Sequence, residues 1–122
     1  MNTPETEVED VLRRLRRFGG EPAKLEVKKA TGGLPKNLVE TVSAFANTNG
    51  GLIILGVDES EGFIAVPLTD PAKLRDDLVS AASDQLTPPV RPDAELVEAD
   101  GEVIVMAKID PLPSEQRPCY AM

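Results

Sequence analysis

The sequence predicts an α+β domain with one mixed β-sheet and about three helices packed on it. Segments with helical periodicity alternate along the chain with short apolar or alternating segments of strand length. An Asp100-Gly101 pair between two such segments indicates a β-hairpin. The 122 residues suit one domain, spanning 1–122, that can bury its own core.

Three segments have the pattern of amphipathic helices. The first runs from about Pro4 to Phe18, with Thr3 as N-cap and Gly19-Gly20 as the stop. Its apolar residues share the spacing of one buried stripe: Val8, Val11, Leu12, Leu15 and Phe18. The second helix is expected from Pro35 to about Asn47, and the third from Pro71, after the cap Asp70, to the Pro88-Pro89 pair.

The strands are expected between and after these helices. Residues 24–29 alternate, so Leu25 and Val27 face the core while Glu26 and Lys28 form a polar, ionic outer face. Residues 52–57 are apolar on both faces, which is typical of a central strand, and residues 63–66 return as its hairpin partner. A second hairpin joins residues 95–99 to 103–109, and the proline-rich tail is expected to be irregular.

The composition excludes several classes of enzyme. There is no histidine and only one cysteine, Cys119, so a Ser-His-Asp triad, a His-paired cysteine nucleophile and a structural zinc site are excluded. No segment approaches the roughly 18 apolar residues that span a bilayer, and the acidic start lacks the features of a signal peptide. We therefore expect a cytoplasmic protein without a membrane partner, in which the lone cysteine has no special role.

The charge is unevenly distributed. The net charge is −8, yet residues 11–36 hold eight bases against two acids, a local +6, while the other 5 bases and 19 acids give −14. Such a basic zone can attract a polyanion locally, because salt screens the repulsion by the acidic remainder beyond about 8–10 Å. The candidate nucleic-acid-binding residues are Arg13, Arg14, Arg16, Arg17, Lys28, Lys29 and Lys36. The alternative is that the arginines form a solvated helix face near the negative end of the dipole.

The segment Ser43-Ala44-Phe45-Ala46-Asn47-Thr48-Asn49-Gly50-Gly51, followed by an apolar strand ending in Gly56-Val57-Asp58, resembles the signature of the Schlafen-type AlbA-like domain. The resemblance extends back to Glu26-Val27-Lys28 and forward to Arg117-Pro118-Cys119-Tyr120, nearly the whole chain. It implies a nucleic-acid-binding module of a transcriptional-regulator-like protein, with DNA favoured over RNA and a homodimer expected. Family domains continue with one more strand, so this chain is expected to be truncated before its last strand.

The same resemblance implies a second possibility, a metal-dependent RNA endonuclease. Its acidic trio would be Glu21, Glu26 and Asp58, with Glu59 as an alternative third member, and three carboxylates could hold Mg²⁺ or Mn²⁺. The alternative is that Glu26 and Lys28 form a cross-strand ion pair that contributes little, beside a solvated acidic turn. We favour binding, which requires no cofactor, over hydrolysis. A third possibility is a protein-interaction or dimerisation domain that uses the acidic remainder.

The segment Gly32-Gly33-Leu34-Pro35-Lys36 precedes a helix but is not a nucleotide-binding P-loop. It departs from the GxxxxGK[ST] pattern, and Pro35 lacks the amide that would face a phosphate. Lys36 at the helix start could still receive one backbone phosphate.

Overall fold

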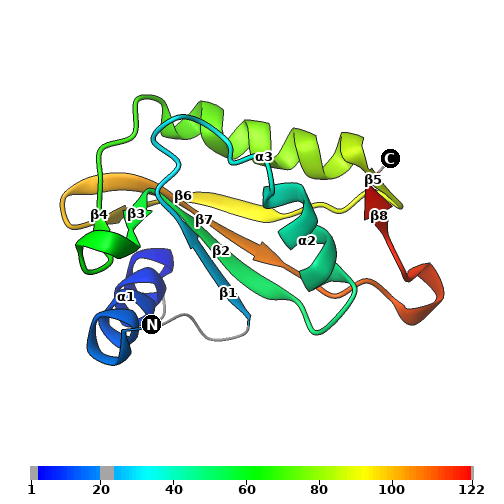
Figure 1. The fold of residues 1–122 in the computed structure, drawn as a ribbon, viewed down its shortest axis with the longest axis horizontal. Coiled ribbons are helices and arrows are strands. Elements are labelled where there is room, and N and C mark those ends of the chain that lie inside the picture. Colours follow the sequence, from blue (N-terminus) through cyan, green and yellow to red (C-terminus); the bar gives the residue numbers. More distant parts are fainter. Residues whose placement is uncertain (1–2, 20–23, 122) are drawn as a thin grey trace.

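The structure is a computed structural model that describes residues 3–19 and 24–121. Its main sheet has four strands in the order β1-β2-β7-β6, in which β1 runs parallel to β2 and the other neighbours are antiparallel. These strands are β1 (Leu25–Lys28), β2 (Gly51–Leu55), β7 (Glu102–Ile109) and β6 (Asp93–Ala99). The predicted α+β architecture with a mixed sheet is confirmed (Figure 1).

Three α-helices and two small two-stranded sheets complete the described part of the chain. The helices are α1 (Pro4–Phe18), α2 (Leu38–Ala46) and α3 (Pro71–Gln85), with short 3₁₀ turns η1 (Glu59–Glu61) and η2 (Ser114–Gln116). The small sheets pair β3 (Val57–Asp58) with β4 (Ile64–Ala65), and β5 (Leu86–Thr87) with β8 (Tyr120–Ala121).

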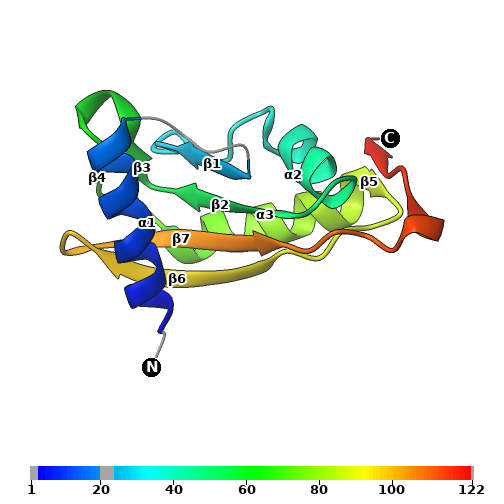
Figure 2. The same ribbon diagram turned by 90° about the horizontal axis from the view of Figure 1, so that it is seen from below.

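The helices lie on opposite faces of the main sheet, α1 on one face and α2 with α3 on the other (Figure 2). Strand residues alternate between these faces because the side-chain period is two. What we call the α1 face buries Val8, Leu12 and Leu15 of α1 against Val27, Ile54, Ile104 and Met106. What we call the α2/α3 face buries Leu38, Val42 and Leu78 against Ile53, Leu55, Val105 and Ala107.

Helix α1 has the predicted bounds and both predicted end signals. The Thr3 hydroxyl accepts the Thr6 backbone amide at 3.1 Å, and Gly19 ends the helix with a left-handed φ of 73°. The prediction that Phe18 belongs to the buried stripe is wrong, because its side chain is 76% exposed. Leu15, three residues earlier on the same stripe, is the last apolar residue of α1 that is buried in the core, so the periodicity continues one residue beyond the packed part of the helix.

Five other element predictions need correction. Helix α3 ends at Gln85, and Leu86–Thr87, expected to continue it, form β5. Helix α2 begins at Leu38, since Pro35 instead accepts the Leu38 amide in a turn. The apolar strand over residues 52–57 is broken at Gly56, whose φ of 107° separates β2 from β3. Strand β6 begins two residues early, at Asp93. The tail, which was expected to be irregular, contains the strand β8. It pairs with β5, and the local sequence pattern does not indicate this pairing.

The Gly50-Gly51 pair is required by close packing at the start of β2. A Cβ atom on Gly50 would lie 2.5 Å from the Ile109 carbonyl oxygen, and Gly50 has a positive φ of 80°. A Cβ atom on Gly51 would lie within 2.5–2.7 Å of the Phe45 ring. Any side chain at either position would therefore displace α2 or β7 from the sheet.

Candidate nucleic-acid interface

Arg16 ties α1 to the rest of the molecule. Its Nε and Nη2 atoms donate to the Phe63 carbonyl oxygen at 3.1 and 2.9 Å, and Nη2 also pairs with the Asp100 carboxylate. The same carboxylate oxygen accepts the Ala65 amide at 2.9 Å. These hydrogen bonds, led by the Ala65 amide, lower the pKa of Asp100. Arg16 is therefore a structural anchor between α1, the β3–β4 hairpin and the β6–β7 turn.

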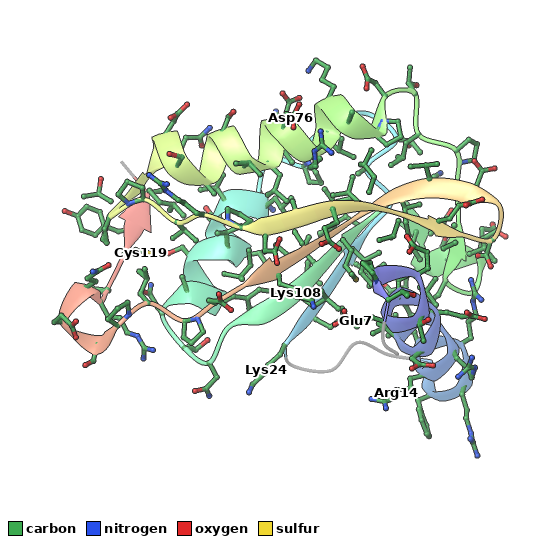
Figure 3. The ribbon with its side chains drawn as sticks, turned by 180° about the vertical axis from the view of Figure 1, so that it is seen from behind. Glu7, Arg14, Lys24, Asp76, Lys108 and Cys119 are labelled. Atoms are coloured by element: carbon green, nitrogen blue, oxygen red, sulfur yellow. The ribbon has the colours of Figure 1, made fainter. Side chains whose placement is uncertain are left out.

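The other three arginines of α1 lie on its exposed side. Arg13 pairs with Asp10 at 2.9 Å and with Glu9 at 3.9 Å. These side chains are exposed, so the ion pairs contribute little to stability. The Arg17 guanidinium lies over the Phe18 ring, 5.6 Å from its centroid. Within the described part of the chain, Arg14 and Arg17 have no carboxylate partner. Arg14 projects from α1 away from the strands (Figure 3).

The lysines of the basic segment differ from one another in their surroundings. Lys28 points to the sheet face opposite α1, since Leu25 and Val27 of the same strand pack into the α1 face. It pairs with Glu26 at 3.1 Å, along one strand rather than across two. Lys29 lies 3.7 Å from the Asp58 carboxylate. Lys36 is exposed and has no ion pair among the described residues.

Of the seven basic residues predicted from the sequence, four are thus committed to carboxylates of the same chain: Arg13, Arg16, Lys28 and Lys29. The other three of these seven, Arg14, Arg17 and Lys36, have no carboxylate partner among the described residues. Two of these three, Arg14 and Arg17, lie one helical turn apart near the end of α1 and are both exposed.

The two described members of the acidic trio are already engaged. The Asp58 carboxylate accepts the Ser60 hydroxyl at 2.6 Å and the Ser60 amide at 3.0 Å, and so caps η1. Its pKa is lowered, mainly by the Ser60 hydroxyl. Glu26 is neutralised by Lys28. Residues 3–19 and 24–121 contain no group of three or more acidic, histidine or cysteine side chains that could hold a metal ion, and Glu21 lies outside them.

Asn47 has a role that the sequence reasoning missed. Its side-chain amide donates to the Cys119 carbonyl at 2.9 Å and its carbonyl accepts the Cys119 amide at 2.8 Å. The Ser43 hydroxyl also donates to the Cys119 carbonyl, at 3.1 Å. This Asn47–Cys119 contact holds the tail so that β8 meets β5. The i, i+4 spacing of Ser43 and Asn47 on one helix face was the available signal.

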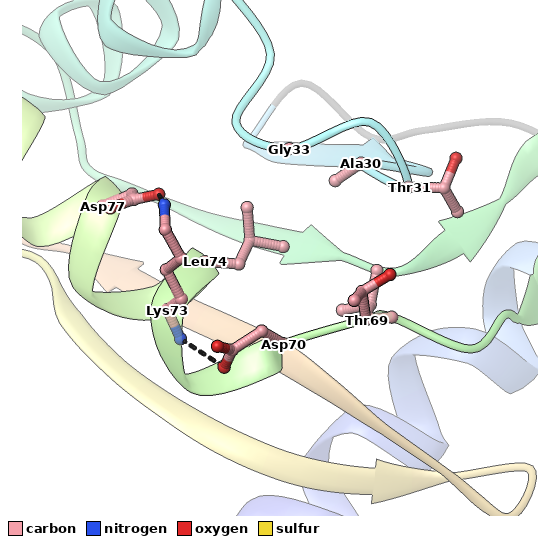
Figure 4. A pocket seen from close by; sticks show the side chains of 9 residues that line it. Ala30, Thr31, Gly33, Thr69, Asp70, Lys73, Leu74 and Asp77 are labelled. Atoms are coloured by element: carbon pink, nitrogen blue, oxygen red, sulfur yellow. Dashed lines mark hydrogen bonds and ion pairs between the residues drawn. The ribbon is translucent and has the colours of Figure 1, made fainter.

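A pocket of about 190 Å³ lies between the loop after β1 and the start of α3 (Figure 4). Its polar lining includes Asp70, Lys73 and Asp77. Asp70 caps α3 through the Lys73 amide at 3.0 Å, and the Lys73 ammonium pairs with Asp77 at 2.7 Å. The lining therefore offers two carboxylates against one neutralised cation, which does not suit a phosphate group.

Comparison with known proteins agrees with this fold. The sequence profile of the family described as Schlafen, AlbA_2 matches residues 21–121. The N-terminal domain of a RecG-related protein from Nitrosomonas europaea, which carries the provisional name of an ATP-dependent DNA helicase, has 30% identity and a TM-score of 0.79. That similarity covers 99% of this chain and 81% of the other.

A second solved structure, the DIP2311 protein from Corynebacterium diphtheriae, has 18% identity and a TM-score of 0.56. The match covers 96% of this chain but 24% of that protein, so it shows the fold alone. The comparison with curated proteins found no match. The chain therefore belongs to the Schlafen AlbA_2 family, as its motif indicated. None of the described helices is both long and apolar enough to cross a membrane.

Proposed function

We propose that this domain binds nucleic acid, with DNA preferred, through phosphate contacts made by the basic segment. The observation that carries the proposal is a pair of arginines on the exposed side of α1, Arg14 and Arg17, for which residues 3–19 and 24–121 supply no carboxylate partner. They lie within the local +6 segment of a chain whose net charge is −8. The name of the Nitrosomonas europaea relative, a DNA helicase, supports DNA as the ligand.

The seven basic residues would contribute unequally. Arg14, Arg17 and Lys36 have no carboxylate of the described segments to leave before they bind phosphate. Arg13 can exchange its exposed carboxylate partners for phosphate at little cost. Lys28 and Lys29 would have to leave Glu26 and Asp58. Arg16 would act indirectly by holding α1 in place. A module of this kind would suit a regulatory protein that acts on DNA, and the expected homodimer stays a prediction.

A salt titration of the whole chain tests the proposal. Fluorescence anisotropy with a labelled DNA duplex should detect binding at 50 mM salt, and the affinity should fall steeply as salt rises because counterions are released. Changing Arg14 and Arg17 together to alanine should reduce the logarithmic salt slope by roughly 2. Binding that is absent at 50 mM salt, or that does not change with salt, would overturn the proposal.

The matched control removes two cations elsewhere. Lys73 and Arg75 lie on α3, on the opposite side of the sheet, and pair with Asp77 and Asp76. Their double alanine variant has the same change in net charge. If it weakens binding as much as the α1 variant does, net charge and not the α1 surface determines affinity, and the assignment of the site is wrong.

A further inference from the structure

Phe18 is the most exposed of the large apolar side chains in the described chain, at 76%. It ends a helix in which Val8, Leu12 and Leu15 are buried and Val11 is partly buried. An exposed aromatic ring next to charged groups is a common element of ligand surfaces, since the ring has polarisable faces and a large apolar area. We therefore consider the Phe18 ring as a candidate contact for a ligand.

The surroundings of the ring are cationic. Positions 14, 17 and 18 follow the i, i+3, i+4 spacing, so Arg14, Arg17 and Phe18 share one surface at the end of α1. The Arg17 guanidinium lies over one face of the ring, 5.6 Å from its centroid, and the Phe18 side chain is still 76% exposed. Neither arginine is neutralised by a carboxylate of the described residues.

A ligand that matches this surface has negative charges separated by flat rings. Single-stranded nucleic acid has this chemistry, because its unpaired bases stack on aromatic side chains while its phosphates contact arginine. Bases in a duplex are stacked on one another and offer no free face. Three phenylalanines and one tyrosine are too few for an extended stacking platform, so the ring of Phe18 would hold a single base.

We propose that the end of α1 holds one unpaired base on Phe18, with Arg14 and Arg17 on the flanking phosphates. This inference rests on the proposed function and specifies its ligand as a strand with at least one unpaired base. The domain would then favour single strands, overhangs or junctions over continuous duplex. The preference would be largely independent of sequence because every base has a stacking face.

The experiment compares a labelled single-stranded oligonucleotide with the blunt duplex of the same sequence at equal salt. The single strand should bind more tightly to the unaltered chain. Phe18→Leu, which keeps apolar bulk without a π face, should weaken single-strand binding about 5- to 100-fold and leave duplex binding unchanged. Phe18→Trp should keep or improve it. Because Phe18 is so exposed, these variants should fold, which circular dichroism verifies.

Three outcomes separate this inference from the proposed function. Duplex binding without a preference for single strands, or equal single-strand affinity of the Phe18→Leu variant and the unaltered chain, overturns the stacking inference and leaves phosphate binding intact. Absence of binding to both probes at 50 mM salt overturns the proposed function as well. Weaker binding of both probes by Phe18→Leu would mean that the ring positions the arginines instead of a base, and would also overturn the inference.

Discussion

Different interactions attach the neighbouring segments to the two faces of the sheet. On the α2/α3 face, neutral hydrogen bonds from Ser43 and Asn47 hold the tail at Cys119 beside a large apolar core. On the α1 face, ion pairs from Arg16 to Asp100 and from Glu7 to Lys108 border a smaller core. The contact of the tail depends on packing and neutral hydrogen bonds, whereas the attachment of α1 also depends on charge. Attachment of α1 should therefore respond to pH and salt, and the tail should not.

The largest effect is expected at the Asn47–Cys119 contact. Asn47→Ala removes both hydrogen bonds with Cys119 and a longer one to the Ser43 hydroxyl, and it leaves the Cys119 amide without its partner. We therefore expect a loss of about 1–3 kcal/mol of unfolding free energy. Urea denaturation measures it, and the loss should not depend on salt. Asn49→Ala is the control from the same motif, since Asn49 is exposed and its side chain makes no hydrogen bond to the described residues. Equal effects of the two changes would show that the contact is unimportant.

A smaller effect is expected at Asp100. Its φ of 52° is tolerated by asparagine, so Asp100→Asn removes the charge while the side-chain carbonyl can still accept the Ala65 amide. We expect a loss of about 1 kcal/mol at pH 7, discounted because the pair with Arg16 is partly exposed.

The pH dependence of that variant carries the stronger test. The folded pKa of Asp100 is lowered, so its stabilising effect is present above the unfolded value of about 3.9 and is lost as pH falls through the folded pKa. Thermal denaturation between pH 7 and 2 should show a shallower acid decline for Asp100→Asn. Glu98→Gln, on an exposed residue beside the same turn, should keep the steep decline. Parallel declines of the Asp100 variant and the unaltered chain would refute the role of this carboxylate.

The smallest effect is expected at Glu7, whose carboxylate pairs with the Lys108 ammonium at 2.9 Å. Glu7→Gln should lower stability by about 0.2–1 kcal/mol at low salt, and less at 1 M salt because the pair is exposed. Glu7 raises the pKa of Lys108, so the contribution is present below the unfolded value of about 10.4 and is lost as pH rises through the folded pKa. A salt-independent loss would point to packing of the side chain instead of charge.

Local patterns predicted most of the fold, because its elements follow local rules. Thr3, Gly19 and Asp70 end or begin helices as their chemistry requires, and the Asp100-Gly101 turn joins β6 to β7. Phe18 was misplaced because periodicity indicates which face of a helix is apolar but not how far the sheet beneath it extends. Strand β8 was missed because it depends on Asn47, a contact 72 residues away in sequence.

The candidate site was predicted less completely than the fold. The sequence indicates where the bases are concentrated, and Arg14, Arg17 and Lys36 have no carboxylate partner in the described residues. It does not show that Arg16 reaches Asp100, 84 residues away in sequence, or that Lys28 points away from α1. Such pairings depend on which strands and turns meet in three dimensions. A linear count of charge cannot separate a cation that is free from one that is neutralised within the chain.

Helix α1 also bears on how the domain should be divided. The family match begins at residue 21, after α1 has ended, yet Val8, Leu12 and Leu15 of that helix form one cluster with Ile54, Ile104 and Met106. A fragment that begins at the start of the match would expose the apolar residues of this sheet face to water, and the fragment would be prone to self-association. The boundary of sequence similarity and the boundary of the cooperative unit therefore differ, and shortened versions of the protein should retain the first eighteen residues.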